Sequence, residues 1–464
     1  MPIPESLPAA AVAFKPDAVR CFRFLEWRLD RAGGRIDLGY AVDSEELHEQ
    51  VELGTPVTGL DGVRLAALER AVSLLHLVAG VSYYKTCFAP EISIETELPD
   101  AELAAFLHHL YASGLAECRY VNGLRGREIP PFPASAAPGS AGPASATPAP
   151  PAGVGQRPLV PVGGGKDSIV TLEAVRTTGR EPLLFSAGTP AAVLRSVAVA
   201  GLSHVSVSRT LDPRLLELNS SGAYNGHVPV TAITSCLAVI AALVHGAGEV
   251  VMADERSASA PNLVWDGVEV NHQYSKSWDF ERRFAAVIST FVAADLGYFS
   301  LLRPWSELAI ARRFATLPAY HHAFVSCNRA FLLDRDRRTP SWCGDCPKCR
   351  FVTLALAPFL DRDRIVSIIG SDLLDDSAQL PGFAALLGLD ADKPLECVGE
   401  VEEARVAMRL LGDADGWGDT AVVRALRADP HVAGLRADVM EAVFTPSAEH
   451  ALPARYAGFA DALG

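Results

Sequence analysis

The six residues Gly163 to Ser168, with the sequence GGGKDS, combine the groups that proteins use to bind phosphate. Consecutive glycines leave one side of a turn without Cβ atoms, so that backbone amides can approach a ligand closely. Lys166 offers a positive charge, Ser168 a hydroxyl, and Asp167 a carboxylate that can hold Mg²⁺ against phosphate oxygens. The sequence therefore predicts a nucleotide-phosphate loop made of Gly163, Gly164, Gly165, Lys166, Asp167 and Ser168, with Asp167 as the magnesium ligand.

The flanks of this loop predict a strand before it and a helix after it. The apolar run 159–162 precedes the glycines, and apolar residues follow at helical spacing over 169–175. The loop then lies at a helix N-terminus, where free amides and the helix dipole favour an anion. The alternative is an ordinary glycine turn with helix capping by Asp167 or Ser168, and the strand, loop and helix in this order favour the phosphate loop.

The cysteines Cys343, Cys346 and Cys349 form two overlapping CxxC turns. This spacing directs thiolates to one point, and structural zinc takes four ligands. Cys327 is the expected fourth ligand, so the sequence predicts a structural Zn²⁺ site. An iron–sulfur cluster held by three cysteines and a catalytic thiol are the alternatives, while cysteines that merely pack are disfavoured. The nine cysteines, an odd number with no export signal, do not suggest a disulfide framework.

Polar residues follow the predicted strand 249–253 and fill the segment 271–277. Nucleotides lie at the carboxyl ends of the strands in a doubly wound sheet, where the strand order switches. Asp254 and Glu255 are therefore expected in the crevice, and the adenine is expected near Phe185, at the end of a strand predicted over 182–187. The segment 271–277 offers many hydrogen-bond donors and no apolar periodicity, which is typical of a functional loop.

Four parts of the chain differ in their patterns. Alternating apolar residues over 21–54 predict a small antiparallel sheet, and helices near 60–78 and 100–113 complete an α+β domain. The stretch 131–156 is rich in Pro, Ala, Gly and Ser, which predicts a flexible linker or an exposed loop. The nucleotide-binding part has further predicted elements, a strand over 204–207 and a long helix over 228–247. The expected parts are the α+β domain 1–130, the linker 131–156, the ATP-binding domain 157–340 and the cysteine cluster with a helical region 341–464.

Beyond Phe351 the pattern is almost wholly helical. This region holds few polar groups that ask for a catalytic explanation. The expected helices are 352–359, 364–369, 382–387, 401–411, 420–428 and 435–443.

Charge and hydropathy exclude several classes of function. The chain has 41 Lys and Arg against 55 Asp and Glu, a formal charge of −14, which argues against a nucleic-acid partner. No apolar run reaches the roughly 20 residues that cross a bilayer, and no signal peptide is recognisable at the N-terminus. The chain is therefore expected in the cytoplasm with no membrane partner, and its sequence indicates no particular oligomeric state.

The phosphate loop resembles the PP-loop of the ATP pyrophosphatases, whose signature is a serine or similar small residue, two glycines, any residue, and then Asp-Ser. The resemblance implies a doubly wound parallel α/β sheet of the adenine nucleotide alpha-hydrolase-like type. Members of that superfamily split ATP between its α and β phosphates, which gives an adenylated substrate and pyrophosphate.

Four later segments extend the resemblance over most of the chain. Together with the phosphate loop they resemble the MurL family of bacterial UDP-N-acetylmuramoyl-L-alanyl-L-glutamate epimerases. The family implies use of ATP and Mg²⁺ to convert the terminal L-glutamate of UDP-MurNAc-L-Ala-L-Glu to D-glutamate for peptidoglycan synthesis, with release of AMP and pyrophosphate. The segments are Ala253–Ser257, Asn271–Lys276, Cys343–Cys349 and Glu396–Glu400.

The implied chemistry explains why an epimerase would carry a phosphate loop. A Cα–H beside a free carboxylate is very weakly acidic, because its removal places a second negative charge next to the first. Adenylation removes the carboxylate charge and makes the carbonyl an electron sink, so that a positioned base can take the proton. We expect Lys276 and Lys85 to contact the substrate or the adenylate, with Tyr274 or Asp254 as a nearby base, and a cluster around Tyr83, Tyr84 and Lys85 to close over the other face.

Two alternatives belong to other classes of protein. The first is a PP-loop amidotransferase or tRNA-thiolating enzyme, against which the acidic charge and the lack of a recognisable glutaminase domain count. The second is an inactive nucleotide-binding module, which the intact Lys-Asp-Ser and the polar segment 271–277 disfavour.

Overall fold

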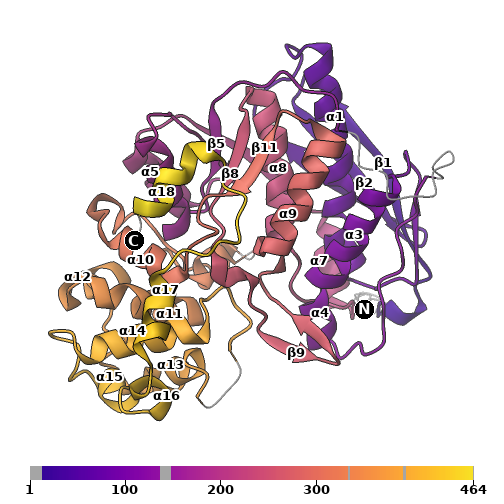
Figure 1. The fold of residues 1–464 in the computed structure, drawn as a ribbon. Helices are drawn as coiled ribbons and strands as arrows, with labels where there is room; N and C mark the ends of the chain where they lie inside the picture. Colours follow the sequence, from indigo (N-terminus) through magenta and orange to yellow (C-terminus); the bar gives the residue numbers. More distant parts are fainter. Residues whose placement is uncertain (1–12, 136–147, 333–334, 390–392, 463–464) are drawn as a thin grey trace, which may run out of the picture.

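The computed structural model describes residues 13–135, 148–332, 335–389 and 393–462. Its framework is one large mixed sheet, mostly parallel, with helices on both faces (Figure 1). The nine strands lie in the order β11-β8-β5-β6-β7-β3-β2-β1-β4. The expectation of an α/β fold is thus confirmed at the level of a mixed, mostly parallel sheet.

The first region forms the antiparallel end of this sheet. Strands β1 to β3 pair in sequence as a meander, and β4 joins the edge parallel to β1. The expected strands within 21–54 and the two expected helices are confirmed. The elements are β1 (Cys21–Asp30), β2 (Arg35–Val42), β3 (Glu45–Glu52), α1 (Gly62–Ala79), α2 (Val81–Tyr84), β4 (Glu91–Ile94), α3 (Ala101–Gly114) and α4 (Ala116–Val121).

The second region is a parallel, doubly wound half with the strand order β11-β8-β5-β6-β7. The chain moves outward in one direction from β5 through β6 to β7, and in the other direction from β5 through β8 to β11. The carboxyl ends of β5 and β8 therefore border the crevice where such sheets bind ligands. The strands are β5 (Pro158–Pro161), β6 (Leu183–Ala187), β7 (His204–Thr210), β8 (Glu249–Met252) and β11 (Gly297–Ser300), beside the hairpin β9 (Leu263–Trp265) and β10 (Val268–Val270).

Side chains alternate between the two faces of this parallel half. Leu183 and Phe185 of β6 belong to the core that contains α1 and α8, whereas Leu184 packs into a second core with α5 and α10. This alternation follows from the two-residue period of a strand. The helices of this region are α5 (Lys166–Thr177), α6 (Ala191–Ala200), α7 (Pro213–Ser220), α8 (Val230–His245), α9 (Trp278–Val287) and α10 (Glu307–Ala315).

The two regions share one sheet and one core. Strand β3 pairs antiparallel with β7, and the core of the first region continues into α8 and β8. Glu49 of β3 is fully buried and accepts two hydrogen bonds from the Arg209 guanidinium of β7, at 2.5 and 2.8 Å. Within the described residues, the first region is therefore joined to the nucleotide-binding part by strand pairing, and not by a linker alone.

The ends of the expected linker 131–156 are packed in place. Phe132 is buried, Ala152 is fully buried, and Asp295 accepts hydrogen bonds from the amides of residues 152–154. Residues 136–147 of the expected linker lie outside the described residues.

The C-terminal region is a helical lobe that packs below the parallel strands, coloured orange to yellow in Figure 1. The chain then returns upward, so that Tyr456 packs on Phe299 of β11 and its hydroxyl donates to Glu249 of β8. The expected helices are confirmed. They are α11 (Pro347–Leu356), α12 (Arg362–Ile369), α13 (Leu380–Leu386), α14 (Val401–Gly412), α15 (Ala421–Leu426), α16 (Pro430–Ala433), α17 (Ala437–Phe444) and α18 (Ala457–Ala462).

One helical stretch, Gly62–Tyr84, is long and apolar enough to span a membrane by length and composition. Most of it is buried, since α1 packs against both α8 and the first strands. Its apolar character is thus explained by a position between two layers of the core.

Candidate active site

A cavity of about 450 Å³ opens at the carboxyl ends of β5 and β8. The segment 325–331 forms another wall, and Lys348 of α11 contributes a second lysine next to Lys276. Segments that are far apart in the sequence therefore meet around one crevice. The predicted site residues that line it are Gly163, Gly165, Asp167, Ser168, Asp254 and Lys276.

The glycine loop has the geometry that a phosphate ligand requires. Helix α5 begins at Lys166 with Gly165 as its N-cap and with no side chain accepting from its first amides. Ser168 instead donates its hydroxyl hydrogen bond to the Gly165 carbonyl, at 3.1 Å. The alternative of an ordinary cap by Asp167 or Ser168 is therefore not what the structure has, and the amides at the helix N-terminus remain available to an anion.

At Gly164 of the turn, any larger residue would be strained. Its φ is +85°, and a Cβ there would lie 2.9 Å from the Ala192 Cβ of α6. Its carbonyl also accepts from the Val325 amide at 2.9 Å, which fixes the wall 325–331 against the loop. Gly163 differs, because a Cβ at that position meets nothing within 4 Å.

Gly164→Ala should therefore destabilise the protein by about 1–3 kcal/mol, since it adds a strained φ and a steric overlap. Gly163→Ala is the matched control and should leave the free energy of unfolding almost unchanged. Urea unfolding of the two variants beside the unaltered protein measures both values. Equal unfolding midpoints for the two variants would contradict this account of the loop.

Lys166 does not line the cavity in the structure. Its side chain is buried and its ammonium pairs with the Asp167 carboxylate, at 2.5 Å, and with Glu307 of α10. Burial alone lowers the pKa of Lys166, but these two carboxylates outweigh burial and hold the pKa above its ordinary value. The lysine thus neutralises acidic groups beneath the loop, whereas its sequence position suggested a direct phosphate contact.

Three carboxylates gather next to this lysine. Asp167, Glu255 and Glu307 each offer an oxygen, and these oxygens all lie within 4.8 Å of one another. Glu255 is buried and its Oε2 has no hydrogen-bond partner, while burial, followed by the charge of Asp167, raises the pKa of Glu307 to about 8. Clustered hard oxygen donors suit Mg²⁺, so these residues fit the metal that the phosphate loop implies.

Asp254 and Lys276 face the cavity from the loop after β8 and from the short 3-10 helix η3 (Tyr274–Lys276). Burial raises the pKa of Asp254 to about 7, although the charges of Lys276 and Arg303 oppose this rise. Asp254 is thus a carboxyl group of the cavity whose pKa is raised toward neutral pH.

A buried arginine, Arg303, joins the loop after β8 to the 3-10 helix η3. The Arg303 guanidinium donates to the Glu281 carboxylate at 2.8 Å, to the Glu255 carbonyl at 2.5 Å and to the Lys276 carbonyl at 2.6 Å. The side chains of Arg303 and Glu281 are 1% and 3% exposed, so water does not replace these bonds.

Arg303→Met should cost about 3–5 kcal/mol of folding free energy, because it leaves the Glu281 carboxylate buried without a counter-charge. The exposed Arg282, which pairs with Asp279 on the surface, provides the control, and Arg282→Met should change stability by about 0.5 kcal/mol or less. Denaturant unfolding tests both. A double variant with Glu281→Leu should recover part of the loss, and no recovery would show that the charge is not the cause.

The remaining predicted residues lie elsewhere. Phe185 is fully buried in the core beside α8 and offers no side chain to the cavity. Tyr274 is buried and its hydroxyl donates to Asp279 at 3.1 Å. Lys85 is buried as well and donates to the side-chain oxygens of Asn219 and Asn225. None of the three lines this cavity.

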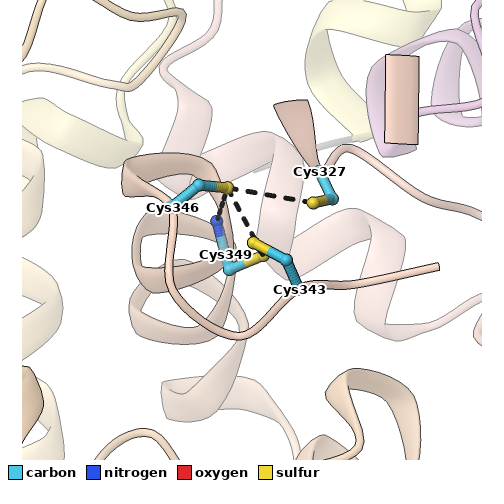
Figure 2. A group of neighbouring side chains, drawn as sticks. All are labelled: Cys327, Cys343, Cys346 and Cys349. Carbon is cyan, nitrogen blue, oxygen red and sulfur yellow. Dashed lines mark hydrogen bonds between the residues drawn. The ribbon is translucent and has the colours of Figure 1, made fainter. Parts of the chain in front are cut away.

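The four cysteines Cys327, Cys343, Cys346 and Cys349 converge (Figure 2). The Cys346 sulfur lies 3.5 Å from that of Cys349 and 3.9 Å from that of Cys327, and Cys343 and Cys349 are 3.8 Å apart. All four thiols are free. Four bonds of about 2.3 Å in a tetrahedron place sulfurs about 3.8 Å apart, so the group fits Zn²⁺ without rearrangement.

Two groups next to the phosphate loop were missed in the sequence, Glu307 and Lys348. Glu307 carries no local motif, and it reaches the phosphate loop only because α10 packs on α5. Lys348 lies inside the CxxC turns, where its neighbours draw attention to metal binding. Glu255, expected beside Asp254 because both follow the strand 249–253, lies in the group of carboxylates next to Lys166.

Comparison with known families matches residues 13–301 to the MurL N-terminal domain and residues 323–440 to the MurL C-terminal domain. The two matches together cover both the sheet and most of the helical lobe, including the phosphate loop and the cysteine cluster.

Three relatives are similar over nearly their whole length, and each is named UDP-N-acetyl-alpha-D-muramoyl-L-alanyl-L-glutamate epimerase. The protein of Salinispora tropica is 45% identical over 454 residues, which cover 96% of this chain and 95% of the relative. That of a Micromonospora species is 44% identical over 443 residues, covering 94% and 96%. That of Xanthomonas oryzae pv. oryzae is 43% identical over 418 residues, covering 90% and 91%.

Proposed function

The chain belongs to the MurL family of epimerases, and we propose that it inverts the terminal L-glutamate of UDP-MurNAc-L-Ala-L-Glu through an acyl-adenylate. The overall reaction consumes ATP and releases AMP and pyrophosphate. Its product, which carries D-glutamate, enters peptidoglycan synthesis.

One observation carries the proposal of ATP use. The cavity at the ends of β5 and β8 combines an uncapped helix N-terminus, two lysines and a group of carboxylates. Free amides at a helix N-terminus and lysines bind phosphate oxygens, and clustered carboxylates bind Mg²⁺, so this combination of groups supports ATP as a substrate.

The residues in and next to the cavity have different roles in adenylation. The amides of the glycine loop hold the phosphates, and Lys276 and Lys348 add positive charge where the pyrophosphate leaves. Asp167, Glu255 and Glu307 are the residues that would hold Mg²⁺, which when bound neutralises phosphate charge. The glutamate carboxylate attacks the α phosphorus, and the bond to the bridging oxygen breaks with its electron pair leaving on pyrophosphate.

Adenylation prepares the Cα–H bond for cleavage. The mixed anhydride carries no carboxylate charge, so the electron pair released at Cα can move onto the acyl oxygen. A base of the site removes the proton, and a proton is returned on the opposite face. Hydrolysis of the anhydride then releases AMP and makes the cycle irreversible.

The test is the release of pyrophosphate with different substrates. We expect AMP and pyrophosphate from ATP only when UDP-MurNAc-L-Ala-L-Glu is present, and none with UDP-MurNAc-L-Ala alone, which lacks the glutamate. Formation of ADP and phosphate, or epimerisation without ATP, would refute the proposal.

A further inference from the structure

A second cavity, of about 280 Å³, adjoins the ATP cavity. The two share Val325 and Phe331 of the wall 325–331, and the second cavity also borders the start of α6 and residues 338–340. The reaction proposed above places ATP in the first cavity and assigns no ligand to the second.

Positive charge distinguishes the lining of this second cavity. Arg195 of α6 and Arg338 line it, and no carboxylate is among its described lining residues, although Asp and Glu outnumber Lys and Arg by 55 to 41 in the whole chain. Each guanidinium donates from Nε to a backbone carbonyl, that of Ala323 for Arg195 and that of Leu332 for Arg338. Neither arginine pairs with a carboxylate in the described part of the chain, so both charges are open to an anionic ligand.

The start of helix α6 adds to this positive potential. Ala191 and Ala192 line the cavity, Pro190 is the N-cap, and no side chain accepts from the first amides of the helix. Free amides at a helix N-terminus favour phosphate oxygens. The second cavity thus repeats the combination found in the ATP cavity, where the start of α5 lies beside Lys276 and Lys348.

An exposed aromatic ring lines both cavities. Phe331 ends the short 3-10 helix η6 (Asn328–Phe331), and it is 36% exposed. Pro190, Ala330 and Pro340 add apolar surface to the second cavity. Nucleobases stack on aromatic side chains, and arginine binds phosphate through paired hydrogen bonds. An apolar lining next to two arginines therefore suits a nucleoside diphosphate.

The two nucleotides of the proposed reaction make different demands on such a cavity. The phosphates of ATP are held at the glycine loop, and adenosine itself carries no negative charge for the two arginines to neutralise. The UDP-dipeptide brings a second diphosphate, while its glutamate carboxylate must reach the α phosphorus of ATP. Two extended amino acids span about 7 Å, and the sugar adds to this reach. The second diphosphate therefore belongs in a cavity that adjoins the ATP cavity without coinciding with it.

We propose, on the basis of the function proposed above, that the second cavity binds the uridine diphosphate part of UDP-MurNAc-L-Ala-L-Glu. Arg195, Arg338 and the first amides of α6 hold the diphosphate, and the uracil lies against Phe331. The sugar and the dipeptide extend along the wall 325–331, so that the glutamate enters the ATP cavity.

Binding of UDP alone tests the site without any chemistry. Isothermal titration calorimetry with UDP and Mg²⁺ is carried out on the full chain, with and without saturating α,β-methylene-ATP, which cannot release pyrophosphate. We expect a similar Kd for UDP in both cases, because the two nucleotides occupy different cavities. Arg195→Ala and Arg338→Ala should each raise the Kd for UDP by about 10–100-fold, since each loses a charge-assisted contact.

Steady-state kinetics separate this role from a structural one. Each variant should raise KM for UDP-MurNAc-L-Ala-L-Glu by a similar factor and leave KM for ATP and kcat unchanged, because the lost contact is equally strong in the ground state and the transition state. Arg436→Ala, at an exposed arginine of the helical lobe that pairs with Asp438, is the control and should change none of these values. Thermal unfolding checks the fold of each variant, and Arg338 is exposed, so its replacement should leave the fold intact.

The possible results are distinguishable. An unchanged Kd for UDP in both variants overturns the proposal. Displacement of UDP by the ATP analogue, or a raised KM for ATP in place of the raised KM for the UDP-dipeptide, overturns it as well and assigns the second cavity to adenosine. Failure of adenylation is a separate result, because a protein that binds UDP through Arg195 but releases no pyrophosphate with the full substrate keeps this site and refutes the acyl-adenylate.

Discussion

Asp167→Asn is expected to reduce substrate-dependent pyrophosphate release by about 10²-fold or more at saturating ATP. The change removes the charged ligand at the first turn of α5 and leaves Glu255 and Glu307 to hold a metal alone. Losing one preorganised charge contact of this kind in a closed site costs about 3–4 kcal/mol in transition-state stabilisation. The rate is measured with a coupled pyrophosphate assay over a range of Mg²⁺ concentrations.

The fold should survive this change. Glu307 still pairs with Lys166 in the Asp167→Asn variant, so the buried ammonium keeps a counter-charge. Asp415→Asn, at an exposed position of the helical lobe, is the control and should match the unaltered protein. A wild-type rate in Asp167→Asn, with the same unfolding midpoint, would remove Asp167 from the nucleotide site.

Cys349→Ala is expected to abolish stoichiometric metal binding and to lower stability by several kcal/mol. Cys349 is fully buried, and its sulfur lies within 4 Å of the sulfurs of Cys343 and Cys346. Because metal binding free energy is also folding free energy for such a site, loss of one thiolate destabilises the start of α11 and the segment that contains Cys327. Elemental analysis and thermal unfolding, with and without a chelator, measure the two effects.

The control is Cys236→Ala, a buried cysteine of α8 outside the group, which should cost stability only through a small cavity and leave metal content unchanged. Zinc in freshly purified protein supports the structural site. Iron together with visible absorbance would indicate an iron–sulfur cluster at these cysteines in place of zinc. Absence of both metals from such protein would contradict a metal site altogether.

The parts of the fold that depend on local pattern could be predicted. The strand before the glycines, the long apolar helix α8 and the helices of the C-terminal lobe follow from hydrophobic period and turn residues over short windows. The glycine loop is another local feature, because positive φ at Gly164 and an open helix N-terminus need only a few adjacent residues.

The parts that depend on tertiary contact could not be predicted in this way. The pairing of β3 with β7 joins two regions through only three residue pairs, and no pattern within either strand marks it. Phe185 shows the same limit on a smaller scale, since strand alternation turns its side chain to the core and away from the crevice.

Electrostatic partners are the least visible in a sequence. In the sequence, Lys166 has the position of a phosphate ligand. In the structure its ammonium pairs with Glu307, which lies far along the chain. His272 is marked in the sequence only as part of a polar segment, since its hydrogen-bond partner Glu117 lies far before it in the chain. The segment 271–277 therefore also predicts Tyr274 as a proton-transfer group, whereas in the structure the Tyr274 hydroxyl donates to Asp279.

The most direct test is a single incubation that follows stereochemistry and ATP cleavage together. UDP-MurNAc-L-Ala-L-Glu, ATP and Mg²⁺ are incubated with the protein in deuterium oxide, and chiral analysis of glutamate is combined with counts of AMP and pyrophosphate. We predict D-glutamate that carries deuterium at Cα, with at least one AMP and one pyrophosphate formed for each inverted residue. D-Glutamate formed in the absence of ATP, or AMP formed while the glutamate keeps its L configuration and its original hydrogen, would contradict an epimerisation that proceeds through the adenylate.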